Sequence, residues 1–289
     1  MKKWLSLVLA LAVALVISAC GTSEDNADGG NADSGKEETS KLVVGASNVP
    51  HAEILEEAKP LLEEKGIELE VVTFQDYILP NQALNSGELD ANYFQHIPYL
   101  EAQIEENDYD FVNAGGIHIE PIGVYSKKYK SLDELPDGAK VLMSNSVADH
   151  GRILTMLEKE GLITLKEGLI TLKEGVDKIK ATIDDIETNE KNLEFDTEYE
   201  ASLLPQIYNN DEGDAVLINS NYAIDAGLNP IEDSIAIEDK ESPYVNVIAV
   251  KSGDEDKEAV KALVEVLHSK EIQDFILEKY EGAVVPVSE

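Results

Sequence analysis

From Lys41 onward, the pattern of apolar and polar positions alternates between strand-like and helix-like segments. Short apolar or alternating runs predict strands at residues 42–46, 67–72 and 117–125. Apolar side chains at helical spacing predict helices at residues 52–65, 81–87 and 97–106. Because strands and helices follow one another in turn, we expect an α/β lobe with a largely parallel sheet.

A second α/β lobe begins after Tyr125 in the same pattern, with a capped turn at 131–135. Further strands are expected at residues 139–143, 215–218 and 244–250, and further helices at residues 151–160, 257–267 and 270–280. The strand at 244–250 leads back to the first lobe. We therefore expect one lobe built from residues 41–125 and 246–289, and a second from residues 126–245.

The N-terminus has the pattern of a secretory signal. Two lysines precede an apolar run at residues 5–17, which is too short to span a bilayer because a spanning helix needs about 20 residues. The run leads into Ile-Ser-Ala-Cys at residues 17–20, which resembles a bacterial lipobox. The resemblance implies that residues 1–19 are a signal peptide and that Cys20 carries lipid at the extracytoplasmic face of the cell membrane. A chance Cys is the alternative.

Residues 20–40 predict a flexible tether between that anchor and the folded body. They are rich in Ser, Asp, Asn, Gly and Glu and contain no apolar run, so they cannot bury enough surface to fold. A coil of this length spans roughly 25 Å root-mean-square. The tether would keep the body near the membrane surface while leaving it free to turn.

Charge and cysteine content exclude several classes of function. The chain has 58 acidic and 23 basic side chains, a net charge of −35, which rules against nucleic acid and against docking on anionic lipid. One Cys excludes a disulfide scaffold and a thiolate metal cluster. The nucleophile-elbow and phosphate-loop motifs of common enzymes are missing. An enzyme is therefore disfavoured, with a surface hydrolase as the alternative. We also expect a monomer that carries no cofactor.

Two segments rich in aromatic residues stand out. Residues 74–81 come at the end of a predicted strand, and residues 90–99 place three aromatics and His96 close together in a chain that is only 6% aromatic. Such side chains suit the walls around a soft apolar group. A thioether sulfur gains about 0.3–1.5 kcal/mol from aromatic contact. An ordinary core strand and turn is the alternative.

Two polar segments follow strands of the second lobe. Arg152 is the only Arg in the chain and lies near a predicted helix start, where anions are favoured. Its guanidinium can hold a carboxylate by two hydrogen bonds, which Lys cannot copy. Asn219 and Asn221 follow the strand at 215–218, at the end where ligands gather in α/β lobes. Asn both donates and accepts, as a zwitterionic amino acid requires. A surface Arg and a helix cap are the alternatives.

Four histidines raise a metal hypothesis: His51, His96, His118 and His150. Their spacing matches no helical pair and no compact ligand motif. Scattered polar or surface histidines are therefore favoured, and no metal site is expected.

A tandem repeat interrupts the second lobe, because residues 160–166 recur unchanged as residues 167–173. Two copies are too few for a solenoid, which needs at least three units. We expect a gene duplication that enlarges a surface loop. A specificity insert is the alternative.

Taken together, the segments resemble the MetQ/NlpA family of methionine-binding lipoproteins from about Lys41 to the C-terminus. The matching stretches, in family order, are Asp76-Tyr77, Pro80-Asn81, Gly87–Asn92, Phe94-Gln95-His96, Pro98–Leu100, Asn145, Gly151-Arg152, Asn219–Ala223 and Ala226–Leu228. The resemblance implies a two-lobed fold of the type II periplasmic-binding-protein kind with a cleft between the lobes. It also implies delivery of L-methionine to the permease and ATPase of an ABC importer.

The resemblance further implies a set of ligand-binding residues: Tyr77, Tyr93, Phe94, His96, Asn145, Arg152, Asn219 and Asn221. The aromatic residues and His96 would surround the methionine side chain, Arg152 would bind the α-carboxylate, and the three Asn would orient the polar groups. The loop from Asn145 to Arg152 departs from the family pattern Asn-Asp-Pro/Ala-x-Asn-x-Gly-Arg. Glycyl-methionine, D-methionine or another amino acid therefore stays open as the ligand, as does a metal-binding receptor.

Overall fold

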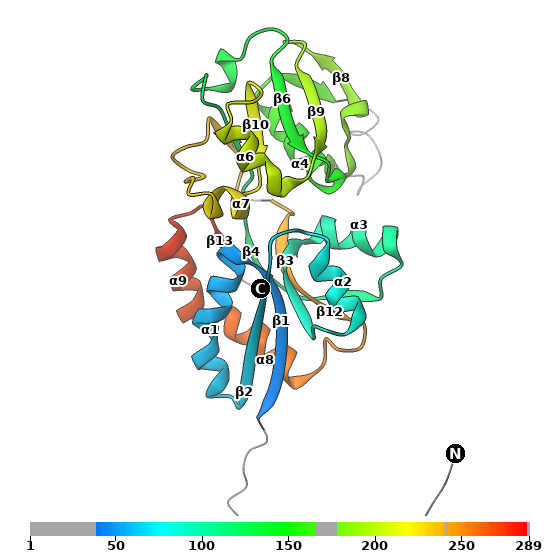
Figure 1. Cartoon of the computed structure of the whole chain (residues 1–289), viewed down its shortest axis with the longest axis vertical. Coiled ribbons are helices and arrows are strands. Elements are labelled where there is room, and N and C mark those ends of the chain that lie inside the picture. The colour runs from blue at the N-terminus through cyan, green and yellow to red at the C-terminus, as the bar shows by residue number, and fades with distance from the viewer. Residues whose placement is uncertain (1–38, 166–177, 241, 288–289) are drawn as a thin grey trace, which may run out of the picture. The chain divides into compact units, whose positions relative to one another are not determined.

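The computed structural model describes residues 39–165, 178–240 and 242–287 (Figure 1). The expected signal peptide, the expected lipidation site at Cys20 and nearly all of the expected tether lie outside these ranges, as does the second copy of the repeated segment. Among the described residues, no helix is both long enough and apolar enough to cross a membrane.

The first lobe is built on a six-stranded sheet with strand order β13-β4-β12-β3-β1-β2 (Figure 1). β1 runs parallel to β2 and β3, whereas β12 runs antiparallel to both of its neighbours, β3 and β4. The sheet is mixed because β4 leads toward the second lobe and β12 leads back from it. Its strands are β1 (Ser40–Ser47), β2 (Ile67–Phe74), β3 (Ala91–His96), β4 (Phe111–Ile119), β12 (Val245–Lys251) and β13 (Val285–Pro286).

Helices cover both faces of this sheet. α1, α8 and α9 bury one face through a core that includes Leu55, Leu263 and Ile272, and α2 and α3 bury the other through Leu84 and Leu100 (Figure 1). The apolar spacing in the sequence predicts these helices, because each buries the stripe that the spacing defines. They are α1 (Glu53–Glu63), α2 (Leu79–Ser86), α3 (Ile97–Asn107), α8 (Glu258–Leu267) and α9 (Lys270–Tyr280), with a π-helical segment (Asn48–Ala52) before α1.

The second lobe is built on a five-stranded sheet with strand order β11-β5-β10-β6-β9 and has its own core. The sheet strands are β5 (Gly123–Tyr125), β6 (Lys140–Ser144), β9 (Glu194–Tyr199), β10 (Ala215–Ile218) and β11 (Ala236–Ile237). A two-stranded sheet pairs β7 (Ile163–Leu165) with β8 (Ile186–Asn189). The helices are α4 (Val147–Lys159), α6 (Leu204–Asn209) and α7 (Ser220–Asp225), with 3₁₀ turns at Leu132–Glu134, Lys178–Lys180, Ile183–Asp185 and Ala201–Leu203.

The chain crosses between the lobes earlier than the sequence suggests. The single strand expected at 117–125 is two strands, β4 in the first sheet and β5 in the second. Pro121 lies between them and has no backbone N–H to continue a ladder. Gly123–Tyr125 therefore pairs with β10 in the second lobe, although the expected boundary follows Tyr125. The chain returns between β11 and β12.

α4 begins at Val147, before the expected start at Gly151, so Arg152 lies inside the helix. Gly151 is accommodated there because the helix presses against the Lys178–Lys180 turn. A Cβ on Gly151 would lie 2.3 Å from the Lys178 carbonyl oxygen and 2.4 Å from that of Ile179. Gly151, which the sequence suggests as the start of the helix, is thus a position where α4 packs closely against the Lys178–Lys180 turn.

Candidate ligand-binding site

A small cavity of about 20 Å³ lies between the two lobes. A space of that size holds about one water molecule, so the lobes are closed on each other. Tyr77 Oη donates to Asn221 Oδ1 across the gap at 2.6 Å, and Tyr222 Oη donates to the Gln75 carbonyl at 3.3 Å. The cavity is lined by Tyr77, Phe94, Gln95, His96, Tyr99, Glu120, Asp149, Arg152, Asn219, Ser220, Asn221 and Asn246.

Aromatic rings from the first lobe form one wall of the cavity. Tyr77 lies between β2 and α2, Phe94 on β3 and Tyr99 on α3. Their ring centres are 5.9–6.1 Å apart in tilted or edge-on contacts, which aromatic pairs prefer. Tyr222 from the second lobe packs on Tyr77, with ring centres 4.9 Å apart. This wall suits an apolar group with a polarisable atom.

Tyr93 lies beside this wall in sequence but does not line the cavity. It is fully buried in the core of the first lobe, where its hydroxyl is hydrogen-bonded to His118 Nδ1 and its ring contacts His51. Successive side chains of a strand point to opposite faces, so Tyr93 and Phe94 of β3 face different surroundings. Tyr93 supports the site from behind.

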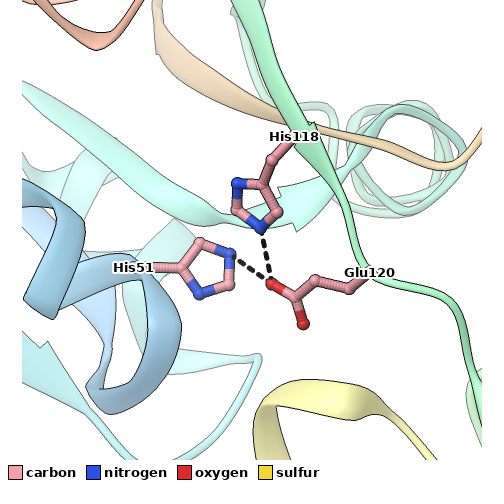
Figure 2. A group of neighbouring side chains, drawn as sticks. All are labelled: His51, His118 and Glu120. Carbon is pink, nitrogen blue, oxygen red and sulfur yellow. Dashed lines mark hydrogen bonds and ion pairs between the residues drawn. The ribbon is translucent and has the colours of Figure 1, made fainter. Parts of the chain in front are cut away.

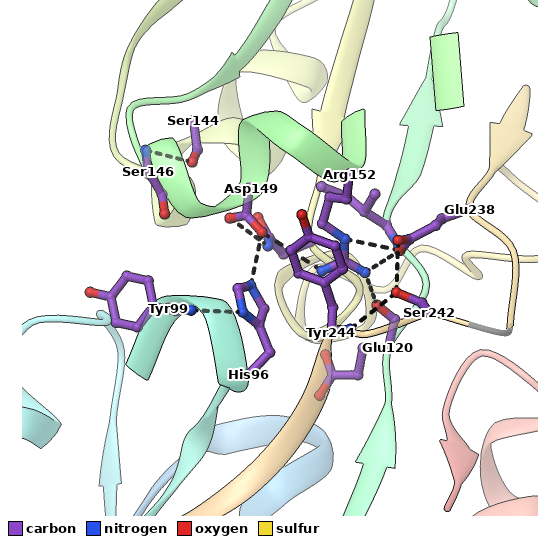
Figure 3. A network of polar contacts seen from close by, with 12 residues as sticks. His96, Tyr99, Glu120, Ser144, Ser146, Asp149, Arg152, Glu238, Ser242 and Tyr244 are labelled. Atoms are coloured by element: carbon purple, nitrogen blue, oxygen red, sulfur yellow. Dashed lines mark hydrogen bonds and ion pairs between the residues drawn. The ribbon is translucent and has the colours of Figure 1, made fainter. Parts of the chain in front are cut away.

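Asp149, on the first turn of α4, faces His96 (Figure 3). Together with Asn219 these two residues form the polar wall. Its Oδ1 lies 3.0 Å from His96 Nε2, and its Oδ2 accepts from Asn219 Nδ2 at 3.2 Å. Burial by itself would raise the pKa of this carboxyl. The hydrogen bond from His96, the charge of Arg152 and the bond from Asn219 outweigh burial and lower the pKa to about 2. Asp149 is therefore ionised at neutral pH.

Arg152 is buried and lines the cavity, and Figure 3 shows it pointing toward Glu238 beside Tyr244. Nε donates to Glu238 Oε2 at 2.9 Å, and Nη2 donates to the same oxygen and to the Glu120 carbonyl at 2.6 Å. Tyr244 stacks 4.6 Å from the guanidinium carbon. Burial disfavours the charge, but Glu238 and Asp149 outweigh it and raise the pKa of Arg152. Nη1, 3.7 Å from Asp149 Oδ1, is the nitrogen least engaged by these bonds.

Asn145 lies outside the inner cavity. It is exposed and borders a wider pocket of about 470 Å³ at the mouth of the site, where its Nδ2 reaches Glu200 Oε1 at 3.5 Å. α4 begins two positions later, so Asn145 precedes the helix while Asp149 and Arg152 point inward from it. Of the residues singled out in the sequence, Tyr77, Phe94, His96, Arg152, Asn219 and Asn221 meet at the inner cavity.

His51, His118 and Glu120 form a buried cluster beside the cavity (Figure 2). Glu120 Oε1 lies 2.7 Å from His118 Nε2 and 3.2 Å from His51 Nε2. Burial lowers the pKa of His51 to about 4 and that of His118 to about 3, so both rings are neutral donors at pH 7. Burial also raises the pKa of Glu120.

Imidazole and carboxylate groups are ligands that zinc accepts, so among the described residues this cluster is the arrangement that fits the metal hypothesis best. The hydrogen bonds nevertheless account for the grouping, because His118 Nε2 bonds to Glu120 Oε1 at 2.7 Å and His51 Nε2 bonds to Asn246 Oδ1 at 3.1 Å. The four histidines do not converge. His96 lines the cavity, and His150 Nε2 bonds to the Ser144 carbonyl at 3.0 Å.

Several cavity residues carry little signal in the sequence. Tyr99, Gln95 and Asp149 lie within the segments that stand out, but nothing distinguishes them from their neighbours there. The sequence around Glu120 and Asn246 gives no sign that they line a cavity. Glu120 is one of 58 acidic residues, and its burial cannot be seen in the sequence. Glu120 directly follows β4, and Asn246 is the second residue of β12. Both therefore lie near a crossing between the lobes, beside the cavity.

Comparisons with known proteins agree with this architecture. The family model described as NlpA lipoprotein matches residues 42–288. The methionine-binding lipoprotein MetQ of Bacillus subtilis is 53% identical over 291 residues, covering 100% of both chains. A solved pheromone cOB1 precursor/lipoprotein of the YaeC family from Enterococcus faecalis is 59% identical, with a TM-score of 0.81 over 86% of this chain and 100% of that one.

A solved nutrient-binding protein from Burkholderia cenocepacia, bound to methionine, is 41% identical, with a TM-score of 0.78 over 86% of this chain and 100% of that one. These likenesses extend over the whole two-lobed body. The fold is accordingly that of the substrate-binding proteins to which it is similar. With a family model that matches nearly all of the folded body, the chain belongs to the NlpA lipoprotein family.

Proposed function

We propose that this protein binds L-methionine between its two lobes and delivers it to the permease and ATPase of an ABC importer. The observation that carries the proposal is the interlobe cavity, which joins an aromatic wall to a charged polar wall. The aromatic wall fits a thioether side chain, and the polar wall fits the two charges of a free amino acid. The relatives support the choice of ligand, because one is named methionine-binding and another was solved with methionine.

We assign the side-chain pocket to Tyr77, Phe94 and His96, and the α-carboxylate to Arg152 through the edge of its guanidinium that faces Asp149. Asn219 and Asn221 would orient the polar groups of the ligand from the second lobe. Tyr93 and Asn145 would act indirectly, Tyr93 by supporting β3 and Asn145 at the mouth of the site.

We further propose that the mature protein is a monomer held at the extracytoplasmic face of the cell membrane by lipid on Cys20. The lipobox-like residues 17–20 support the anchor, and the membership of a lipoprotein family supports it independently. Capture and release of an unmodified ligand require no catalytic step and no cofactor.

Ligand-dependent thermal stabilisation tests the proposal. A ligand that binds only the folded protein stabilises it by about 2.7 kcal/mol at one hundred times its Kd. After unfolding, washing and refolding to remove carried ligand, L-methionine should raise the melting temperature of residues 21–289, and L-alanine should not. D-methionine and glycyl-methionine in the same assay decide the selectivity. A larger rise with either of them, or no rise with L-methionine, would contradict the proposed ligand.

A further inference from the structure

We propose that His51 is a positioning residue for ligand binding, and that the two lobes close only while its ring is neutral, so that ligand affinity falls in mild acid. This inference rests on the proposed function and deepens it, because it names a condition that regulates the interlobe site. His51 does not itself line the cavity, so it acts through residues that do.

Two side chains connect His51 to the cavity. Its Nε2 lies 3.1 Å from Asn246 Oδ1 and 3.2 Å from Glu120 Oε1, and both of these partners line the cavity. Glu120 follows β4, where the chain leaves the first lobe, and Asn246 lies at the start of β12, where it returns. Figure 2 shows the rings of His51 and His118 turned toward Glu120. The N–H at Nε2 of His51 therefore orients side chains at both crossings.

In the closed form, α7 of the second lobe covers this cluster. α7 packs on the π-helical segment that carries His51, and Asn48 Nδ2 of that segment donates to Asp225 Oδ1 at 2.7 Å. The backbone N–H of Asn221, on the first turn of α7, donates to Glu120 Oε2 at 3.0 Å. When the lobes separate, these contacts are lost and water reaches Glu120 from the cavity side. Opening therefore lowers the cost of a charge on His51.

The closed form cannot satisfy a protonated His51. The residue is 1% exposed, and its Nδ1 has no hydrogen-bond partner among the described residues. A neutral ring that donates from Nε2 leaves only a lone pair unpaired at Nδ1, whereas the imidazolium carries an N–H at both nitrogens. A buried, charged donor without an acceptor costs much free energy. Burial accordingly lowers the pKa of His51 to about 4.

The groups around His51 do not reverse this preference. Glu120 favours a charge on His51 and His118 disfavours it, but burial is the largest effect. Burial also raises the pKa of Glu120, which makes the closed form take up protons in acid and reduces the net effect of the histidines. The other titratable or charged groups nearby are Tyr93 on β3, Tyr280 on α9 with Glu53 beside it, and His96 and Arg152, whose charges act on Glu120. The pKa values of Tyr93 and Tyr280 are raised, so both stay neutral in acid.

Proton uptake by the open form should therefore compete with ligand binding. A histidine with the ordinary pKa of about 6.5 is mostly charged at pH 5.5, whereas His51 in the closed form is not. By linkage, we expect the Kd of L-methionine to rise about three- to tenfold between pH 7.5 and pH 5.5. Binding at pH 6.0 should release protons, because closure returns the ring to its neutral form.

Calorimetric titration of the refolded wild-type protein with L-methionine tests this without any variant. The Kd is measured at pH 7.5 and pH 5.5, and the heat at pH 6.0 is compared between MES and phosphate buffers, whose different ionisation enthalpies reveal the protons released. Binding at both pH values with a Kd constant within twofold and no proton release would overturn this inference and leave the proposed function standing. No binding at either pH would overturn both.

Two variants test the residue itself. His51→Gln keeps an N–H donor for Asn246 but cannot be protonated, and His51→Ala has neither property. We expect His51→Gln to bind about as well as the wild-type protein at pH 7.5 and to lose little affinity at pH 5.5. His51→Ala should bind roughly five- to tenfold more weakly at both pH values, because a hydrogen bond that orients Asn246 is lost.

His268→Gln is the matched control. It removes a histidine of the first lobe that bonds to the Gly116 carbonyl on α8's side of β4, away from the cavity lining, so it should keep the pH dependence of the wild-type protein. A full pH dependence in His51→Gln would assign the effect to another group, such as His96, and overturn the proposal. A wild-type Kd in His51→Ala at pH 7.5 would overturn the positioning role.

Discussion

Arg152 illustrates at the residue scale how one side chain belongs both to the contacts of the fold and to the proposed ligand site. Its Nε and Nη2 hold Glu238 and the carbonyl of Glu120, which flank the two crossings between the lobes. Its remaining nitrogen faces the site beside Asp149. A lysine has one compact ammonium and cannot make these bonds in the same plane. The guanidinium therefore links the proposed carboxylate site to the segments about which the lobes would close.

We accordingly expect Arg152→Lys to weaken binding of L-methionine. A hydrogen bond to a charged group contributes about 1.5–3 kcal/mol, so the Kd should rise roughly ten- to a hundredfold. Lys159→Arg, at a surface ion pair with Asp239 on the same helix, is the control and should leave the Kd unchanged. Calorimetry on both variants is the measurement. A near-wild-type Kd in Arg152→Lys would exclude the carboxylate role.

Phe94 tests the side-chain pocket. Its ring lines the cavity and contacts Tyr77 and Tyr99, so it should recognise the ligand's side chain rather than its polar groups. In Phe94→Ala we expect the Kd for L-methionine to rise at least about tenfold and any weak binding of L-alanine to stay level. Phe111→Ala removes a buried ring from the core around α2 and α3 and should lower stability without changing the preference. Equal losses for both ligands in Phe94→Ala would contradict the pocket.

The sequence predicts several residues that line the inner cavity, because they lie in short segments that differ from their surroundings. Tyr77, Phe94 and His96 come from the aromatic segments, and Arg152 is unique by composition. Asp149 could not be distinguished, because acids are abundant throughout the chain and burial is a tertiary property. Whether Asn145 faces the cavity depends on where α4 begins, and a single helical turn decides that.

At the element scale, the periodicity of apolar residues predicts the long helices and strands. The observed bounds differ from the expected ones where a single residue, a proline or a glycine, changes the local structure. α1, α8 and α9 are found close to the expected bounds. The run at 117–125 is apolar enough for one strand, but Pro121 divides it between two sheets. The start of α4 is misjudged at Gly151, because a glycine needed for close packing looks the same in sequence as one that ends a helix.

Gly151 therefore makes a prediction about α4. A methyl group there would meet the carbonyl oxygens of Lys178 and Ile179, so Gly151→Ala should destabilise the protein by about 1–3 kcal/mol despite the better helix propensity of Ala. Val147→Ala, at a position 54% exposed on the same helix, is the control and should be close to neutral. Urea unfolding of both variants measures the difference. A gain in stability from Gly151→Ala would show that α4 and the turn are not packed as described.

The His51–His118–Glu120 cluster links the π-helical segment, β4 and the crossing, and it gives the fold a pH dependence. Both histidines have pKa values below the ordinary 6.5, at about 4 and about 3, because they are buried. The unfolded chain therefore takes up protons that the folded protein does not. The free energy of unfolding therefore has its full value above pH 6.5 and decreases as the pH falls toward 4. Each histidine lowers it by up to about 1.4 kcal/mol per pH unit.

The melting temperature should consequently fall between pH 7 and pH 4.5. Glu120 acts in the opposite direction, because its raised pKa favours the folded state in acid, so the loss should be smaller than the histidines alone would give. A His51→Gln, His118→Gln double variant should show a shallower dependence. A melting temperature that does not change over this range in the wild-type protein would contradict the buried neutral state of the pair.

At the scale of the whole molecule, the proposed binding site is made by the two lobes together. Contacts such as Tyr77 to Asn221 and His96 to Asp149 join opposite walls, so neither lobe alone encloses a ligand. The residues that bridge the lobes are those that would touch the ligand, which makes binding and closure one event. The family relationship covers both lobes together, in keeping with a site that needs both.

Calorimetric titration of refolded residues 21–289 with L-methionine tests the central claim most directly. Heat is the suitable signal because the only Trp, Trp4, lies in the expected signal peptide. The account predicts saturable 1:1 binding at micromolar or tighter affinity. The same titration of Phe94→Ala and Arg152→Lys should show weaker binding in each. A correctly refolded protein that gives no heat with L-methionine would contradict the claim.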